Sequence, residues 1–298
     1  MGDLIHTLPA LTDAARALPG IRFDWVSERG FAENPHWHPA VDDVIVSDLR
    51  RWKKSPLSSW LSKDYMAFRA ALGASEYDVV IDAQGLLKSA WLIARLAHGE
   101  VHGYDKHSVR ESWAAWTYNH RYSVGRDQHA IERTRQLFAQ ALGYELTGPA
   151  DAGIASDTVQ SGDVWLIHGT SRADKEWPEG HWRALAQHLS GEGKRLHIPA
   201  GSDAEIARAH RIASGTDAKI WERCSLSDIK TEMARAQAVV AVDTGLAHLA
   251  DALERRLIML FGPTNPGLVG PKGAHSRLLK ANAMAQIEVQ DVIGALDA

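Results

Sequence analysis

Short runs of residues that are apolar on both faces alternate with amphipathic helical patterns, and this alternation limits the possible folds most strongly. The clearest runs are residues 238–242 and 257–261. A strand is apolar on both faces when helices cover both sides of its sheet, as in parallel α/β sheets. Further predicted strands are residues 23–26, 44–46, 79–81, 164–168 and 195–198, and predicted helices include 182–189, 204–212 and 226–236. The sequence therefore predicts an α/β protein with parallel sheets.

The chain has 298 residues, a length that suggests two domains. The weakest periodicity lies between Tyr144 and Gly162, where the segments TGPADAG and SDTVQSGD have the composition of a linker. We therefore expect a boundary near residue 155, with one domain over 1–155 and a second over 156–298.

Composition and charge exclude several classes of protein. The net charge of −4 carries no basic excess of the kind that nucleic-acid binding requires. No apolar run approaches the roughly 18 residues of a membrane-spanning helix. The single cysteine, Cys224, cannot form an internal disulfide, and the N-terminal segment is not a secretory signal. We expect a soluble cytoplasmic protein.

The N-terminal segment departs from the usual order of an α/β domain. Met1 stands directly before Gly2 and Asp3 and a helical pattern, where a buried strand normally comes first. We expect the first strand of the first domain to be missing. Because Pro9 lies inside the pattern, we also expect a helix that is kinked there or that begins near Thr7.

The segment AVVAVDTGLAHLADAL is the sharpest local signal for a ligand site. It predicts a buried strand that ends at Asp243, followed by Thr244, Gly245 and a helix that carries His248 one turn further on. The free N–H groups of a helix start bind phosphate, and open α/β sheets bind ligands at the carboxyl ends of their strands. The alternative is that Asp243 and Thr244 only cap the helix.

Two other predicted strand ends carry polar groups. After residues 164–168 come Thr170 and Ser171, whose hydroxyl groups can donate to phosphate, and Lys175, which can neutralise a leaving diphosphate. After residues 195–198 comes Glu205, which could accept hydrogen bonds from a ribose. The alternatives are a solvated loop lysine and a carboxylate that only favours the helix dipole.

The first half carries a basic cluster and single arginines. Arg50, Arg51 and Lys54 lie within the segment LRRWKKS, which predicts contact with an anionic substrate or a phospholipid surface, unless the segment is a solvated loop. Arg110 and Arg133 are candidates for binding a carboxylate in bidentate fashion.

Two carboxylates of the first half are candidates for acid–base chemistry. Asp3 stands at the start of the first predicted helix and is the candidate general base, although such residues are usually caps. Asp82 follows the predicted strand 79–81 and lies at a strand end as well.

Metal and cofactor motifs are lacking from the sequence. The fifteen histidines include no H-E-x-x-H arrangement, and the pair His36 and His38 has no third ligand nearby. There is no G-x-G-x-x-G, no P-loop motif and no Asp-X-Asp at a strand end. We therefore expect neither a catalytic metal nor a cofactor.

A family resemblance covers nearly the whole chain. The segments MGDLIHTLPALTDA, LRRWKKS, VVIDAQGLLKSA, HGTSRADKEWPEGHW, VDTGLAHLADAL and FGPTNPGLVG occur in this order. Together they resemble the lipopolysaccharide heptosyltransferases, a family with the GT-B fold. LRRWKK and IDAQGL are similar to the members that add the first heptose rather than the second. The resemblance implies two Rossmann-like domains that face each other across a cleft, with the acceptor bound by 1–155 and the donor by 156–298.

The resemblance also implies an activity. Its members transfer L-glycero-D-manno-heptose from ADP-heptose to the Kdo sugar of Kdo-lipid A, with inversion and without a metal, at the cytoplasmic face of the inner membrane. Asp3 matches the general base, and Lys175 with Thr170 and Ser171 matches the diphosphate-binding loop. The other matches are Glu205 for the ribose; Asp243, Thr244, Gly245 and His248 for phosphate and heptose; and Arg50, Arg51, Lys54, Arg110 and Arg133 for the acceptor. Cys224 departs from the methionine of close relatives near the adenine.

Other functions remain open at this point. A second GT-B transferase with another acceptor would share most of these residues. A nucleotide-sugar binder with impaired catalysis is compatible with an Asp3 that lacks its preceding strand. A metal hydrolase is the third alternative.

Overall fold

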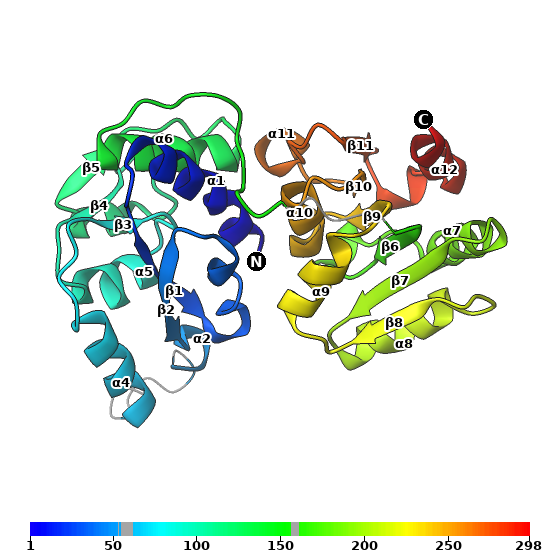
Figure 1. Ribbon diagram of the computed structural model, residues 1–298, viewed down its shortest axis with the longest axis horizontal. Helices are drawn as coiled ribbons and strands as arrows, with labels where there is room; N and C mark the ends of the chain where they lie inside the picture. The colour runs from blue at the N-terminus through cyan, green and yellow to red at the C-terminus, as the bar shows by residue number, and fades with distance from the viewer. Residues whose placement is uncertain (53, 55–61, 156–160) are drawn as a thin grey trace. The chain divides into compact units, whose positions relative to one another are not determined.

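The computed structural model describes residues 1–52, 54, 62–155 and 161–298. These residues divide into two compact units, of which unit 1 holds Met1–Ile5 with Ile154–Ala298 and unit 2 holds His6–Gly153. Figure 1 shows that strands and helices alternate along the chain in unit 1, and that unit 2 contains both as well. The start of the second expected domain, residues 156–160, lies outside the described ranges. The described helices include none that is long and apolar enough to cross a membrane.

Unit 1 is built on a six-stranded sheet with the order β11-β10-β9-β6-β7-β8, in which all neighbours are parallel. The strands are β6 (Asp163–Ile167), β7 (Arg195–Ala200), β8 (Lys219–Glu222), β9 (Ala238–Val242), β10 (Leu257–Phe261) and β11 (Ser276–Lys280). Every residue of β9 and β10 is buried, as strands covered on both faces must be. The predicted parallel α/β architecture is confirmed here.

Helices cover this sheet. They are α7 (Glu179–Gly191), α8 (Asp203–Ile212), α9 (Leu226–Met233), α10 (Gly245–Ala252), α11 (Pro266–Val269), α12 (Val289–Asp297) and the short turns η5 (Ala173–Lys175) and η6 (Met284–Gln286). Of these, α8, α9 and α11 begin at side-chain caps, namely Ser202, Ser225 and Asn265. Trp182 and Leu185 of α7 share one core with Ile212 of α8 and Val292 of α12. Packing against these helices therefore holds in place the strand ends at which the candidate functional site lies.

Unit 2 contains two separate parallel sheets in the described residues. One pairs β1 (Phe23–Glu28) with β2 (Val41–Ser47), and the other has the order β3 (Val80–Asp82), β4 (Val101–Tyr104), β5 (His120–Tyr122). The sequence prediction missed β4, β5, β8 and β11, because runs of three to five residues with polar members resemble loops.

The helices of unit 2 are α1 (Gly2–Ala17), whose first residues group with unit 1, α2 (Leu49–Trp52), α4 (Lys63–Leu72), α5 (Leu87–Leu92) and α6 (Ala130–Leu142). Short 3₁₀ turns are η1 (Arg29–Phe31), η2 (Pro35–Trp37), η3 (Ala94–Leu96) and η4 (Ser112–Thr117). The expected start of the first helix near Thr7 is wrong, since α1 begins at Gly2 and continues past Pro9. Leu8 and Leu11 on either side of this proline are both buried, and their packing offsets the lost backbone hydrogen bond.

A buried ion pair joins α1 to α6 within unit 2. The Arg135 guanidinium donates to Asp13 at 2.6 and 3.3 Å, and both side chains are only 4% exposed. Arg135 also donates to Glu132 and to the carbonyl of Gly148. Removing one partner of such a pair leaves the other charge buried and uncompensated.

We expect Arg135→Met to lower the free energy of unfolding by about 3–5 kcal/mol, the usual cost of breaking a buried ion pair. The matched control is Arg16→Met on α1, the helix that carries Asp13, because Arg16 pairs with Asp151 at the surface. That change should cost less than about 1 kcal/mol. Urea unfolding followed by circular dichroism measures both, and equal losses would contradict the assignment.

Candidate functional site

One carboxylate joins three strand ends of unit 1. Asp243 follows β9, and its Oδ2 accepts hydrogen bonds from Lys175 Nζ at 2.6 Å and from Thr264 Oγ1 at 3.1 Å. Its backbone carbonyl accepts from Thr170 Oγ1 at 3.2 Å. Thr170 and Lys175 lie beyond the end of β6, and Thr264 follows β10. The carboxyl ends of β6, β9 and β10 therefore meet at Asp243.

The ion pair orients the Lys175 ammonium at this edge. The Lys175 side chain is 17% exposed and that of Asp243 is 7% exposed, so water screens their attraction only in part. An ammonium group has three donors, and the bond to Asp243 leaves others for a ligand oxygen. The pair thus places a fixed cation where open α/β sheets bind anions.

The start of α10 lies directly after Asp243. Thr244 precedes the helix and its side chain makes no capping hydrogen bond, so the capping alternative fails for this residue. His248, one turn further, is 7% exposed and its Nε2 lies 3.8 Å from Asp243 Oδ1. The helix start therefore presents backbone N–H groups beside the Lys175–Asp243 pair.

The first turn of α1 lies against this helix start, within unit 1. A Cβ atom on Gly245 would come 2.7 Å from Met1 Cβ, and one on Gly2 would come 3.1 Å from His248 Cδ2. Both glycines are thus needed for the close approach. Asp3, next to Gly2, is exposed in that turn. Asp3 therefore belongs to the turn that packs against the α10 start.

Glu205 has a defined orientation at the end of β7. Its Oε2 accepts from the backbone N–H groups of Gly201 and Ser202, each at 2.9 Å, and Ser202 Oγ accepts from Glu205 N in return. Burial opposes ionisation, but these N–H groups hold the pKa of Glu205 below its usual value. A Cβ on Gly169 would lie 2.6 Å from Oε1, so that oxygen faces the end of β6. Glu205 therefore takes part in capping α8 through Oε2, whereas its Oε1 is not part of the cap.

His168, the residue before Gly169, is fully buried. Burial lowers the pKa of its ring to about 4, so the ring is neutral at physiological pH. Neither ring nitrogen has a hydrogen-bond partner among the described atoms.

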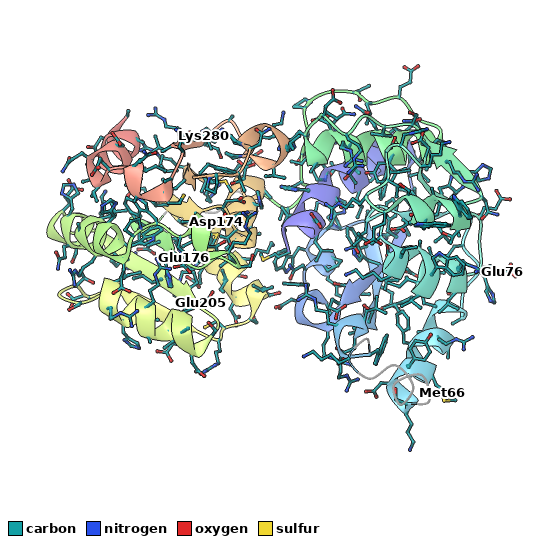
Figure 2. All side chains as sticks on the ribbon, turned by 180° about the vertical axis from the view of Figure 1, so that it is seen from behind. Met66, Glu76, Asp174, Glu176, Glu205 and Lys280 are labelled. Atoms are coloured by element: carbon teal, nitrogen blue, oxygen red, sulfur yellow. The ribbon has the colours of Figure 1, made fainter. Side chains whose placement is uncertain are left out.

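The loop between β6 and α7 is polar and exposed around Lys175. Figure 2 shows Asp174 and Glu176, the neighbours of Lys175, in the same unit as Glu205. Arg172 forms an ion pair with Asp174 and is exposed. Ser171 is exposed beside it. Lys175 is the cation of this loop that pairs with Asp243.

The basic cluster of unit 2 is partly engaged by acidic neighbours. Arg51 pairs with Asp48 at 2.9 Å and with Asp64 at 2.6 Å, so its guanidinium is occupied. The Arg50 guanidinium lies 6.0 Å from the Phe31 ring, and its side chain is exposed. Lys54 is exposed too. Arg50 and Lys54 are the better placed of the three to meet an anion.

Arg133 holds a loop rather than facing solvent. It donates to the Ser108 carbonyl at 2.6 Å and lies 4.9 Å over the Tyr104 ring. Burial lowers the pKa of its guanidinium. Arg110, two residues beyond Ser108, is exposed. Arg133 thus supports the loop that presents Arg110.

Asp82 is held by a buried network. Tyr118 Oη and Ser89 Oγ donate to its Oδ2 at 2.7 and 2.9 Å, and the N–H groups of Gln84 and Gly85 donate to its Oδ1. It is 5% exposed, and burial raises its pKa. Both oxygens are occupied, which favours a structural role over proton transfer.

One group of side chains in the described ranges could offer three metal ligands, namely Glu100, His102 and His120. The two imidazole rings stack with centroids 4.4 Å apart, so their in-plane lone pairs run side by side instead of converging. His120 Nε2 lies 2.5 Å from Glu100 Oε2, and His102 Nδ1 lies 2.9 Å from Tyr122 Oη. Each of the two histidines thus has a hydrogen-bond partner, Glu100 for His120 and Tyr122 for His102.

Sequence reasoning missed Thr264 and His168. Thr264 stands three residues after the apolar run of β10, at a strand end like those that drew attention to Thr170 and Asp243. Applying that rule to every buried strand would have found it.

Comparisons with known proteins show the family to which the chain belongs. The family model described as "Glycosyltransferase family 9 (heptosyltransferase)" matches residues 65–294. The protein named "Lipopolysaccharide heptosyltransferase 1" of Salmonella typhimurium is 46% identical, covering 100% of this chain and 94% of that protein. The chain belongs to the heptosyltransferase family. The protein of the same name in Pseudomonas aeruginosa is 49% identical over 92% of this chain and 79% of that protein.

Solved structures agree in fold. The structure titled "E. coli heptosyltransferase WaaC with ADP" has a TM-score of 0.93 at 44% identity and covers 100% of this chain and 96% of that one. The same enzyme with ADP-2-deoxy-2-fluoro heptose has a TM-score of 0.90 at 43% identity, with the same coverage. The predicted GT-B fold is confirmed. This family member is a glycosyltransferase that transfers heptose in lipopolysaccharide inner-core synthesis.

Proposed function

We propose that the chain transfers L-glycero-D-manno-heptose from ADP-heptose to the Kdo sugar of Kdo-lipid A, with inversion at the anomeric carbon. The observation that carries the proposal is the Lys175–Asp243 pair, which supplies a fixed cation at three strand ends of unit 1. ADP and an ADP-heptose analogue in the titles of structures above 40% identity support a nucleotide-sugar donor.

In this proposal unit 1 binds the donor. Lys175, Thr170 and Ser171 meet the diphosphate, and the N–H groups after Thr244 bind its oxygens, since helix starts favour anions. Glu205 Oε1 accepts hydrogen bonds from the ribose. Gly245 and His248 border the heptose together with Asp243.

The transfer itself is a single displacement. The Asp3 carboxylate takes the proton of the Kdo hydroxyl, whose oxygen attacks the anomeric carbon of the heptose. The new glycosidic bond forms as the bond between that carbon and the diphosphate oxygen breaks, and ADP leaves as an anion. Lys175 and the α10 N–H groups stabilise the charge that develops on the diphosphate.

The acceptor side is proposed for unit 2. Kdo-lipid A is anionic, and Arg50, Lys54 and Arg110 are exposed cations that can meet its carboxylate and phosphate groups. Arg51 and Arg133 would act through their neighbours, the first by ordering the basic segment and the second by holding the loop of Arg110. Such an acceptor places the enzyme at the inner face of the inner membrane.

A defined transfer assay tests the proposal. The protein is incubated with ADP-heptose and either Kdo-lipid A or an acceptor that already carries the first heptose, and the anomeric configuration of the product is read by NMR. Transfer to Kdo with inverted configuration is expected. Transfer only to the second acceptor would point to another heptosyltransferase, and donor binding without transfer would point to a nucleotide-sugar binder.

We expect Arg50→Ala with Lys54→Ala to raise the KM for Kdo-lipid A by about tenfold. Each exposed ion contact contributes roughly 0.7 kcal/mol, and the loss of two such contacts corresponds to that factor. The affinity for ADP-heptose should stay unchanged, and the effect should shrink at high salt. Arg69→Ala on α4 is the matched control, because Arg69 is an exposed arginine of the same unit. Steady-state kinetics in both substrates check this, and equal losses for donor and acceptor would refute the acceptor role.

A further inference from the structure

Unit 2 exposes large apolar side chains on two neighbouring elements. On α5, Leu87 is 39% and Trp91 is 49% exposed, and on η4, Trp113 is 62% and Trp116 is 68% exposed. We call these four residues the indole surface. Every exposed tryptophan in the described part of the chain belongs to it.

The fold holds α5 and η4 together. The backbone N–H of Leu87 donates to Glu111 Oε2 at 2.6 Å, and Glu111 N donates to the Gly85 carbonyl at 3.1 Å. The Trp113 and Trp116 rings lie 4.6 Å apart. The two elements that carry the indole surface are therefore neighbours in the fold.

The inner sides of both elements are already packed. Ala114 and Ala115 of η4 and Ala90 of α5 are at most 1% exposed and belong to one core cluster. Small residues therefore satisfy the core, and the indoles add nothing to it. Exposing such large apolar groups is unfavourable for a surface that stays in water.

Cations lie among the indoles. The Arg95 guanidinium is 5.0 Å from the centre of the Trp91 ring, and Lys88 is exposed on α5 between Leu87 and Trp91. Arg110 lies three residues before Trp113 and is also exposed. Tryptophan sits at the level of lipid headgroups in bilayers, and Lys and Arg attract anionic headgroups.

We propose that the indole surface binds the surface of an anionic phospholipid bilayer, with the indoles at headgroup depth and Lys88, Arg95 and Arg110 on lipid phosphates. The choice of this occupant rests in part on the proposed function, whose acceptor is held in a membrane by acyl chains. Arg110 connects the proposed acceptor site with the indole surface, because it is a proposed acceptor contact and lies three residues before Trp113. Binding there would bring unit 2 to its acceptor by diffusion along the bilayer.

Vesicle sedimentation with the full chain tests this without donor or acceptor. Vesicles of phosphatidylethanolamine with phosphatidylglycerol should bind the wild type, and Trp113→Ser with Trp116→Ser should weaken binding by about tenfold or more, since affinity scales with buried apolar area. Met66→Ser is the matched control, because Met66 is 61% exposed on α4 of the same unit. It should bind as the wild type does, and phosphatidylcholine vesicles should bind less.

Activity separates this proposal from the proposed function. The double variant should lose transfer to Kdo-lipid A in vesicles but keep its kcat/KM for a deacylated, water-soluble acceptor. Equal vesicle binding by the double variant and the wild type would overturn the proposal. Absence of vesicle binding by the wild type would overturn it as well. A dimer that dissociates only in the double variant would instead assign the surface to self-association. Vesicle binding without any heptose transfer would overturn the proposed function alone.

Discussion

Lys175→Ala is expected to lower kcat/KM for ADP-heptose by about 10²–10³-fold, the range found when one preorganised donor to a developing oxyanion is removed. The Lys175 ammonium is held 2.6 Å from Asp243 Oδ2, and a cation whose position is fixed in this way needs little reorganisation when the diphosphate leaves. Steady-state kinetics with a fixed acceptor concentration measure the loss. Because the contact strengthens as charge develops, most of the loss should fall on kcat.

Two further variants separate chemistry from stability. Lys175→Ala leaves the carboxylate of Asp243, which is buried, without its cation, and this alone can destabilise unit 1. Lys175→Arg keeps the charge and should recover folding and part of the activity. Arg172→Ala removes an exposed cation of the same loop and should change kcat/KM less than about threefold, the size expected of a surface ion pair. A folded Lys175→Ala enzyme with wild-type kinetics would remove Lys175 from the mechanism.

Asp3→Asn is expected to lower kcat by about 10²–10⁴-fold, the usual contribution of a positioned general base. Asparagine keeps the size of the side chain, so folding and ADP affinity should survive, as thermal unfolding and calorimetry can show. The pH profile of kcat/KM should also lose its acidic limb, because that limb reports protonation of the base. A variant that turns over at the wild-type rate would make Asp3 a helix-start residue only.

Asp82 offers the matched comparison. Its carboxylate accepts four hydrogen bonds in a buried network, and Asp82→Asn converts part of it from acceptor to donor against Tyr118 and Ser89. That substitution should lower stability while the pH profile keeps its shape. If it removed the acidic limb instead, Asp82 would be the base.

Much of unit 1 could be predicted from the sequence, because its central strands are uniformly apolar. A run such as AVVAV is stable only between two layers of helices. The strands β6, β9 and β10 and their polar ends could therefore be predicted from the sequence pattern alone. The short strands β5 and β11 escaped prediction, since they are largely exposed strands at the edges of their sheets and carry no buried apolar pattern.

The sequence by itself determined the fold class, the family and the residue types at the strand ends. Only the tertiary structure decided how those residues are engaged. Lys175 and Asp243 are 68 positions apart, and their ion pair exists because β6 and β9 are neighbours in the sheet. Arg51 and Arg133 looked equal to Arg50 and Arg110 as cations, yet the fold pairs Arg51 with Asp64 and turns Arg133 toward the Ser108 carbonyl. A sequence specifies the charge of a side chain, whereas its exposure and partners depend on long-range packing.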